Sequence, residues 1–478
     1  MIVGQLTAQS GDFSERLYNT YEQFKEETLK DRRFKHSDIM PLIEQYRENE
    51  QFSVKKVGES IEGRSLNLIS IGEGEKDILL WSQMHGDEST ATMAIFDILN
   101  FLDSKEFTDE KEMILDKVRL HFLPMLNPDG AENFQRRNAL GIDINRDALR
   151  LQSPESKTLK RIRDSLPADF GFNLHDQSRY YNAARTQEPA SISFLAPAFD
   201  YEKTIDRGRK EAMKIIVAMN EVIQEYAPGK VGRYSDDFEP RAFGDNIQKW
   251  GTTTILIESG GYPDDREKQE IRKLNYMAIL SAIKAISTGD YKSESVADYE
   301  KIPENDRMLF DLKIKGITYE LNGEDYILDL GINRSEHDFN DSQDFYYSGR
   351  IEDQGDLSTS YGYENFDSTG YRLKMGKIYP EILADVSAVE KLDLESLLKE
   401  GYAYIRIKEL PQYNNYTEFP VHLVQEYFKV PQDLQPGRNA TFFLEKDGEI
   451  EYAIINGFLF KPEELWSDKN GNALIFRR

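Results

Sequence analysis

The sequence predicts an α/β fold for residues 1–290 and a β-rich accessory region for residues 291–478. Three observations lead to this prediction. Apolar, strand-like runs alternate with helix-like segments as far as residue 290, which is typical of a mostly parallel sheet covered by helices on both faces. The pattern changes around residues 289–303. Beyond that point, short strand-like segments are separated by hairpin turns, which indicates a second, β-rich region.

The first region contains five clear strand candidates and four helix candidates. Ser153, followed by Pro154, marks one helix start, because serine can cap free backbone N–H groups and proline fits the first turn. The expected strands are 66–71, 77–82, 118–126, 169–174 and 252–257, and the expected helices are 89–103, 153–165, 201–225 and 265–287.

The second region is predicted from its turns. Three hairpins are expected to pivot on Asn322-Gly323, Asp447-Gly448 and Asn470-Gly471, since these residue pairs accept the positive φ angles of tight turns. Residues 335–368 are rich in Asp, Ser, Gly and Tyr and are expected to form long loops or short strands. One helix is expected at 392–400, and the region could divide into two small lobes.

The composition limits which binding partners and which cellular compartment we expect for this chain. The formal net charge of −25 argues against nucleic acid and against an anionic membrane surface as partners. The absence of cysteine excludes disulfides, thiolate metal ligands and a cysteine nucleophile. We find neither a signal-peptide pattern nor 18 continuous apolar residues, and therefore expect a cytoplasmic protein without a membrane span.

Four polar residues follow apolar strands in a pattern that suits a metal site. His85 and Glu88 come after the second strand, while His175 and Glu258 each end a later one. A lone His-x-x-Glu pair is most often structural. Here the strand ends converge at the carboxyl edge of the sheet, where open α/β folds bind ligands. Two histidines and one carboxylate are the ligands of a catalytic zinc, and the remaining glutamate can serve as general base.

A cationic segment follows the turn at Asn127-Pro128-Asp129-Gly130. Three arginines and two asparagines lie within the eleven residues 136–146, in an otherwise acidic chain. Such a run is usually a solvated loop. Guanidinium groups also recognise carboxylates in a bidentate manner, so a substrate carboxylate is the expected partner of Arg136, Arg137, Asn145 and Arg146.

The order of these motifs resembles the zinc metallocarboxypeptidase family over residues 38–288, and Glu62-Gly63-Arg64-Ser65-Leu66 resembles the lead-in to the first metal-binding strand. The resemblance implies a three-layer α/β/α fold around an eight-stranded mixed sheet. It also implies one zinc ion per chain, bound by His85, Glu88 and His175. The implied reaction is hydrolysis of a C-terminal peptide or amide bond by a zinc-bound water that Glu258 activates.

The same resemblance assigns the cationic segment. Arg136 would polarise the scissile carbonyl and stabilise the oxyanion, with its neighbour Arg137 as the less favoured choice. Asn145 and Arg146 would hold the terminal carboxylate of the substrate.

The sequence departs from the family pattern at one expected tyrosine. Family members usually carry a tyrosine about twenty residues before the final glutamate, and none stands at that place here. Tyr234 is the nearest upstream, and Phe243 is expected to fill the space. Asp245 could select a basic or amino-bearing side chain, although a simple turn formed with Asn246 is the more ordinary interpretation.

Three functions remain open. The leading one is a zinc exopeptidase that removes a C-terminal residue from a peptide. A near alternative is a zinc amidohydrolase that acts on N-acyl amino acids through the same site. A third is a non-catalytic binding module that uses the aromatic clusters Phe345-Tyr346-Tyr347 and Tyr361-Gly362-Tyr363. The complete ligand set and Glu258 favour an enzyme whose substrate bears a free carboxylate.

Overall fold

The computed structural model describes residues 12–166, 168–466 and 471–477. The chain divides into two compact units, with the boundary in the sequence between Arg307 and Met308. The first unit continues beyond the predicted boundary at residue 290, because strand β10 (Asn305–Arg307) pairs with strand β6 (Tyr181–Ala183). The predicted hairpin at Asn470 falls on a residue outside the described ranges.

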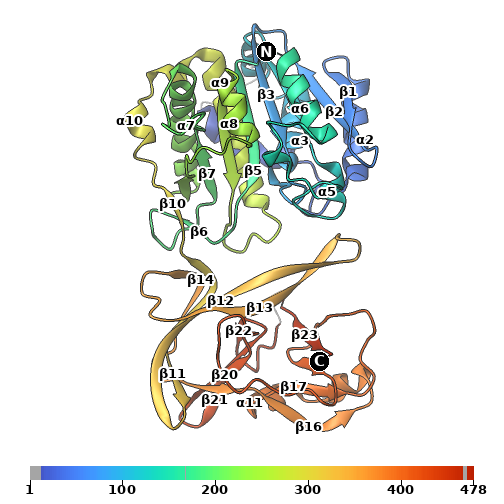
Figure 1. The fold of residues 1–478 in the computed structure, drawn as a ribbon, viewed down its shortest axis with the longest axis vertical. Coiled ribbons are helices and arrows are strands. Elements are labelled where there is room, and N and C mark those ends of the chain that lie inside the picture. The colour runs from blue at the N-terminus through green and yellow to red at the C-terminus, as the bar shows by residue number, and fades with distance from the viewer. Residues whose placement is uncertain (1–11, 167, 467–470, 478) are drawn as a thin grey trace, which may run out of the picture. The chain divides into compact units, whose positions relative to one another are not determined.

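An eight-stranded mixed sheet forms the centre of the first unit (Figure 1). Its strand order is β1-β2-β4-β3-β5-β9-β7-β8. Strands β4, β3, β5 and β9 run parallel to one another, whereas β1, β2 and β7 are each antiparallel to a neighbour. The strands are β1 (Ser53–Glu59), β2 (Ser65–Ile71), β3 (Lys76–Ser82), β4 (Val118–Leu123), β5 (Phe170–Asp176), β7 (Ile192–Leu195), β8 (Val231–Arg233) and β9 (Thr253–Ser259).

Helices cover both faces of this sheet (Figure 1). Side chains alternate along a strand, so Ile78 and Leu80 of β3 pack with α3, α7 and α9, whereas Leu79 and Trp81 pack with α6 and α8. The predicted three-layer α/β/α fold is therefore confirmed. The helices of this unit are α1 (Phe13–Thr20), α2 (His36–Glu48), α3 (Thr90–Asp103), α4 (Thr108–Leu115), α5 (Pro128–Glu132), α6 (Pro154–Ser165), α7 (Arg207–Tyr226), α8 (Phe243–Lys249), α9 (Gln269–Thr288) and α10 (Val296–Tyr299).

Most predicted elements of this unit match the observed ones within a few residues. The helix expected at 201–225 begins only at Arg207, because the side chain of Asp206 caps it by accepting from the Arg209 backbone N–H. No helix in the described residues is long and apolar enough to cross a membrane.

The second unit contains two sheets. The first has the order β13-β12-β11-β15-β20-β21-β22, with β14 beside β11, and the second has the order β16-β17-β19-β23-β18. The strands are β11 (Leu309–Leu321), β12 (Glu324–Phe339), β13 (Asp344–Gly355), β14 (Tyr361–Asp367), β15 (Arg372–Met375), β16 (Lys377–Leu383), β17 (Tyr402–Ile407), β18 (Tyr416–Thr417), β19 (His422–Val424), β20 (Phe442–Lys446), β21 (Glu449–Ile455), β22 (Phe458–Phe460) and β23 (Ala473–Phe476); helix α11 spans Leu394–Lys399.

The accessory region is β-rich, as predicted, and the turns at Asn322-Gly323 and Asp447-Gly448 join β11 to β12 and β20 to β21. Two expectations for this region are wrong. Residues 335–368 lie largely in the long strands β12, β13 and β14 rather than in loops. Buried residues from both sheets share one hydrophobic cluster, so the region forms one unit instead of two lobes.

Candidate active site

The first two predicted ligands lie where the chain leaves β3 and enters α3. Gln83 adopts a left-handed backbone (φ 52°) directly after the strand, and its side chain donates to the carbonyl of Gly86 at 2.8 Å. Gly86 lies against the backbone of Gly130, so closely that an added Cβ would come within 2.0 Å of the Gly130 carbonyl carbon. This close approach requires glycine and fixes the turn that carries His85 and Glu88.

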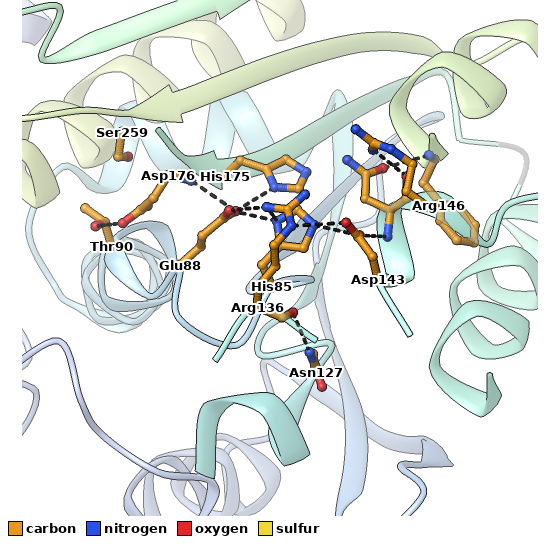
Figure 2. A network of polar contacts seen from close by, with 12 residues as sticks. His85, Glu88, Thr90, Asn127, Arg136, Asp143, Arg146, His175, Asp176 and Ser259 are labelled. Atoms are coloured by element: carbon orange, nitrogen blue, oxygen red, sulfur yellow. Dashed lines mark hydrogen bonds and ion pairs between the residues drawn. The ribbon is translucent and has the colours of Figure 1, made fainter. Parts of the chain in front are cut away.

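His85, Glu88 and His175 converge on one point (Figure 2). Nδ1 of His85 lies 2.7 Å from Oε1 of Glu88, and Nδ1 of His175 lies 2.7 Å from Oε2. All three residues are buried, and their ligand atoms lie within 4.8 Å of one another.

The protonation of this cluster fits a metal ion. Nε2 of His85 lies 3.1 Å from a carboxylate oxygen of Asp143, which leaves the lone pair of the imidazole on Nδ1. Nδ1 and the carboxylate of Glu88 are then two acceptors in contact, which a cation or a shared proton stabilises, and Nη1 of Arg136 is one cation beside both. Burial opposes charge on His85, but the carboxylate of Glu88 outweighs it and raises the pKa of His85 to about 9. Two nitrogens and one carboxylate, all buried and facing one point, fit zinc.

Arg136 and Asp143 support this cluster from one side (Figure 2). Nη1 of Arg136 lies 3.0 Å from Nδ1 of His85 and 3.2 Å from Glu88, and Nε donates to Asp143 at 3.0 Å. Burial would raise the pKa of Asp143, but the hydrogen bond from His85 and the charge of Arg136 hold it well below its usual range. The backbone carbonyl of Arg136 accepts from the side chain of Asn127 at 3.2 Å, which anchors the loop.

Glu258 lies beside the predicted metal ligands. It is the register partner of His175 on the neighbouring strand β9, and its side chain is buried. Burial raises the pKa of Glu258 well above its usual range, and the negative charge of Glu88 adds to this effect. A carboxyl group in such a position holds a proton more strongly than an exposed one does.

A cavity of about 380 Å³ opens over these groups. Of the residues predicted from the sequence, eight line it: His85, Glu88, Arg136, Asn145, Arg146, His175, Asp245 and Glu258. Two predicted substrate contacts, Arg137 and Phe243, do not line this cavity. Arg137 instead donates to the backbone carbonyl of Gly141 at 2.9 Å on the surface.

Asn145 and Arg146 reach the cavity from a short 3-10 turn, Ile144–Arg146. The side-chain oxygen of Asn145 accepts from the Phe243 backbone N–H at 2.8 Å, which ties this turn to the start of α8. Nη1 of Arg146 donates to the carbonyl of Asn145 at 2.8 Å, and Nε lies 3.3 Å from Glu239. The guanidinium group of Arg146 is therefore held at the cavity wall.

The prediction that Phe243 fills the place of the missing tyrosine is wrong. Its ring is fully buried in the core and packs edge-on against Trp250, at a centroid distance of 6.4 Å. Tyr234 lines the cavity instead, directly after β8, together with Tyr181. Burial raises the pKa of Tyr234, and the charge of Glu258 adds to this effect. Tyr234 stands 24 residues before Glu258, and this position was the only indication of its place that the sequence offered.

Asp245 lies near the start of α8, where it accepts from the backbone N–H of Glu239 at 2.7 Å. Burial raises the pKa of Asp245 to about 7. Asp237 and Glu239 also line the cavity, and its uncharged lining includes Asn173, Leu195, Pro197, Ala242, Gly244 and Leu256.

Comparison with known proteins agrees with the resemblance seen in the motifs. Residues 42–190 match the family model of the zinc carboxypeptidases. Carboxypeptidase SOL1 of Arabidopsis thaliana is 29% identical over 171 residues, which cover 29% of this chain and 34% of that protein. Human carboxypeptidase D is 23% identical over 272 residues, covering 49% of this chain and 19% of that protein.

A metallo-carboxypeptidase structure from Burkholderia cenocepacia aligns with a TM-score of 0.45 at 20% identity, covering 54% of this chain and 70% of that one. The chain spans about a third of the length of the first curated relatives that it matches. The family model and the curated relatives confirm the predicted resemblance to the zinc carboxypeptidases.

Proposed function

We propose that this chain, which carries a zinc carboxypeptidase segment at residues 42–190, is a zinc-dependent exopeptidase that hydrolyses the C-terminal peptide bond of its substrate. One observation carries the proposal. Three buried ligand atoms of His85, Glu88 and His175 lie within 4.8 Å of one another, and Glu258 stands one strand away, in register with His175.

The proposed reaction divides between the metal and the chain. Zinc held by His85, Glu88 and His175 would supply Lewis-acid polarisation of the scissile carbonyl and of the attacking water. Glu258 would accept a proton from that water while the oxygen bonds to the carbonyl carbon. It would then give the proton to the leaving nitrogen as the C–N bond breaks. Burial raises the pKa of Glu258, which makes its carboxylate a stronger proton acceptor than an exposed one.

The two cavity arginines have separate roles in this proposal. Arg136, oriented by Asp143 at 3.0 Å, would stabilise the oxyanion. Asn145 and Arg146 would form the carboxylate clamp, the pair that binds the free terminal carboxylate. Arg146→Ala should lower kcat/KM far more for free-acid peptides than for their amides, and equal losses would remove the clamp from the proposal.

Acidic residues around the clamp support a basic C-terminal side chain. Asp237, Glu239 and Asp245 line the cavity near Arg146, and the buried Asp245 would be held ionised by an ammonium or guanidinium partner. Peptides ending in lysine should therefore be cleaved faster than peptides ending in norleucine, which has the same carbon chain without the ammonium group. Asp245→Asn should abolish this difference.

Tyr234 is the proposed substitute for the missing family tyrosine. It lines the cavity with Glu258, so its hydroxyl can contact a bound substrate. Tyr234→Phe should raise KM while the zinc content stays unchanged.

The decisive experiment uses zinc-loaded wild type and Glu258→Gln with matched peptide acids, peptide amides and N-acyl amino acids, read by mass spectrometry. Wild type should release the C-terminal residue from the peptide acids. Glu258→Gln should keep about one zinc per chain and lose about 10²–10⁴-fold in rate, whereas His175→Ala should lose the zinc. Cleavage confined to N-acyl amino acids would favour the amidohydrolase, and an active Glu258→Gln would refute the assigned base.

A further inference from the structure

A buried ion pair lies directly behind the metal ligands. Asp176 follows His175 at the end of β5, and its side chain is 7% exposed. One carboxylate oxygen, Oδ2, accepts from Thr90 at 2.6 Å and from Nζ of Lys268 at 2.9 Å. The backbone N–H of Asp176 donates to Oε2 of Glu88 at 3.2 Å. Figure 2 shows the contacts of Asp176 with Thr90 and Glu88.

Lys268 completes the pair from the start of α9. Its side chain is 12% exposed, and Nζ also donates to the backbone carbonyl of Ser259 at 3.1 Å. The backbone of Lys268 is left-handed, with φ 53°. A residue with a Cβ holds that conformation at a cost of about 1–3 kcal/mol, and such strain persists only where surrounding contacts impose it.

The contacts of this pair reach a residue beside each part of the proposed catalytic centre. Thr90 begins α3 two residues after Glu88, Asp176 adjoins His175, and Ser259 adjoins Glu258. One carboxylate and one ammonium group thus tie together the three segments that carry two metal ligands and the general base. The described residues provide no partner for Oδ1 of Asp176, although this atom is buried, so the ion pair is the main compensation for burying the charge.

We propose that Asp176 and Lys268 are positioning residues that set the zinc affinity of the site by holding Glu88, His175 and Glu258 at a fixed separation. This inference rests on the metal site of the proposed function. Outer contacts of metal ligands typically contribute 10–100-fold in metal affinity. The pair should act as a unit, because each partner loses its role when the other is removed.

The test measures zinc affinity in the full chain by competition with a fluorescent chelator. Asp176→Asn and Lys268→Met should each weaken zinc binding by at least about 10-fold. The double variant should bind no more weakly than the worse single variant, and Lys268→Arg should stay within about threefold of wild type. Cobalt-loaded Lys268→Met should also show a shifted visible absorption spectrum, because its ligand geometry changes.

A matched control separates positioning from general stability. Lys230 is similarly buried, with its side chain 14% exposed, and pairs with Glu188, neither of which lines the cavity. Lys230→Met should leave the zinc affinity unchanged. Folded Asp176→Asn and Lys268→Met with wild-type zinc affinity would overturn the proposal, even if both variants melt at lower temperature. Zinc affinity is read without peptide hydrolysis, so an inactive wild type that binds zinc would overturn the proposed function alone.

Discussion

Replacing Asp143 by asparagine should weaken zinc binding and slow catalysis, although the two side chains have nearly the same shape. The carboxylate of Asp143 contacts Nε2 of His85 at 3.1 Å with one oxygen and Nε of Arg136 at 3.0 Å with the other. Both partners are donors. Asparagine offers only one oxygen, so it can accept from one of them and must turn its NH₂ group toward the other.

Either orientation of the amide is unfavourable. If the oxygen stays on His85, the NH₂ group faces the N–H of Arg136 and one charge-assisted hydrogen bond is lost, at a cost of about 1.5–3 kcal/mol. If the amide is reversed, it donates to Nε2 and moves the imidazole proton to Nδ1, the atom that would bind the metal. The side chain of Asp143 is only 9% exposed, so water compensates little. We expect about a 10–100-fold loss of zinc affinity, equivalent to about 1.4–2.7 kcal/mol.

The assay is chelator competition for zinc, followed by kcat/KM on a peptide acid at saturating zinc. Arg136 loses its orienting contact, so kcat/KM should remain reduced even in the fully loaded variant. Asp147→Asn is the matched control. Asp147 is buried in the same loop but accepts only from the backbone N–H groups of Gln152 and Ser153, each at 2.9 Å. If Asp143→Asn keeps zinc affinity and kcat/KM within about threefold of wild type, the assigned tautomer of His85 is wrong.

Three further outcomes follow from packing and burial. Gly86→Ala should destabilise the first unit by about 1–3 kcal/mol and lower zinc content, because its Cβ would lie 2.0 Å from Gly130; thermal unfolding and elemental analysis check this. Arg272→Met should cost about 3–5 kcal/mol in urea unfolding, since it leaves the buried Asp97 without its ion-pair partner. Burial lowers the pKa of His422 to about 3, so the unfolded chain binds the extra proton between about pH 6.5 and pH 3. As the pH is lowered through that window, the free energy of unfolding of the second unit should fall by about 1.4 kcal/mol per pH unit. Hydrogen exchange in β19 and β23 should report this fall, and His422→Gln is the control that should not show it.

The grouping of the predicted metal ligands with Glu258 could be expected from the sequence because the sheet brings them together. Strands β3, β5 and β9 are adjacent and parallel, so polar residues that follow their apolar runs meet at one edge. His85, His175 and Glu258 therefore needed only the recognition of three buried strands, which continuous apolar runs indicate well. The apolar pattern determines both the strand and the point where it ends.

Residues that reach the site from loops could not be assigned in the same way. Arg136 and Arg137 are neighbours in a segment without periodicity, and only the folded structure distinguishes them, by the contacts of Arg136 with His85, Glu88 and Asp143. The expectation that Phe243, and not Tyr234, would occupy the place of the missing tyrosine was wrong for a related reason. Spacing along the chain does not show that α8 turns the phenylalanine into the core while the end of β8 presents the tyrosine to the cavity.

The long strands of the second unit were missed for a different reason. Strand β13 alternates between buried and partly exposed residues, and its exposed positions carry the Asp, Ser and Arg that suggest a loop. Pairing with β12 along the strand satisfies its backbone hydrogen bonds. That long-range pairing, which local composition does not encode, is what makes the segment a strand.

Three carboxyl groups in or beside the cavity differ in their ionisation, although the sequence shows only that all three are acids. The cations around Asp143 hold its pKa well below the usual range. Burial raises the pKa of Asp245 to about 7. Burial and the negative charge of Glu88 raise the pKa of Glu258 well above its usual range. At neutral pH Asp143 is therefore a fixed anion that contacts Arg136 and His85, whereas Glu258 holds a proton more strongly, as the proposed general base requires. The sequence identifies all three as acids, but only their neighbours separate a supporting anion from a general base.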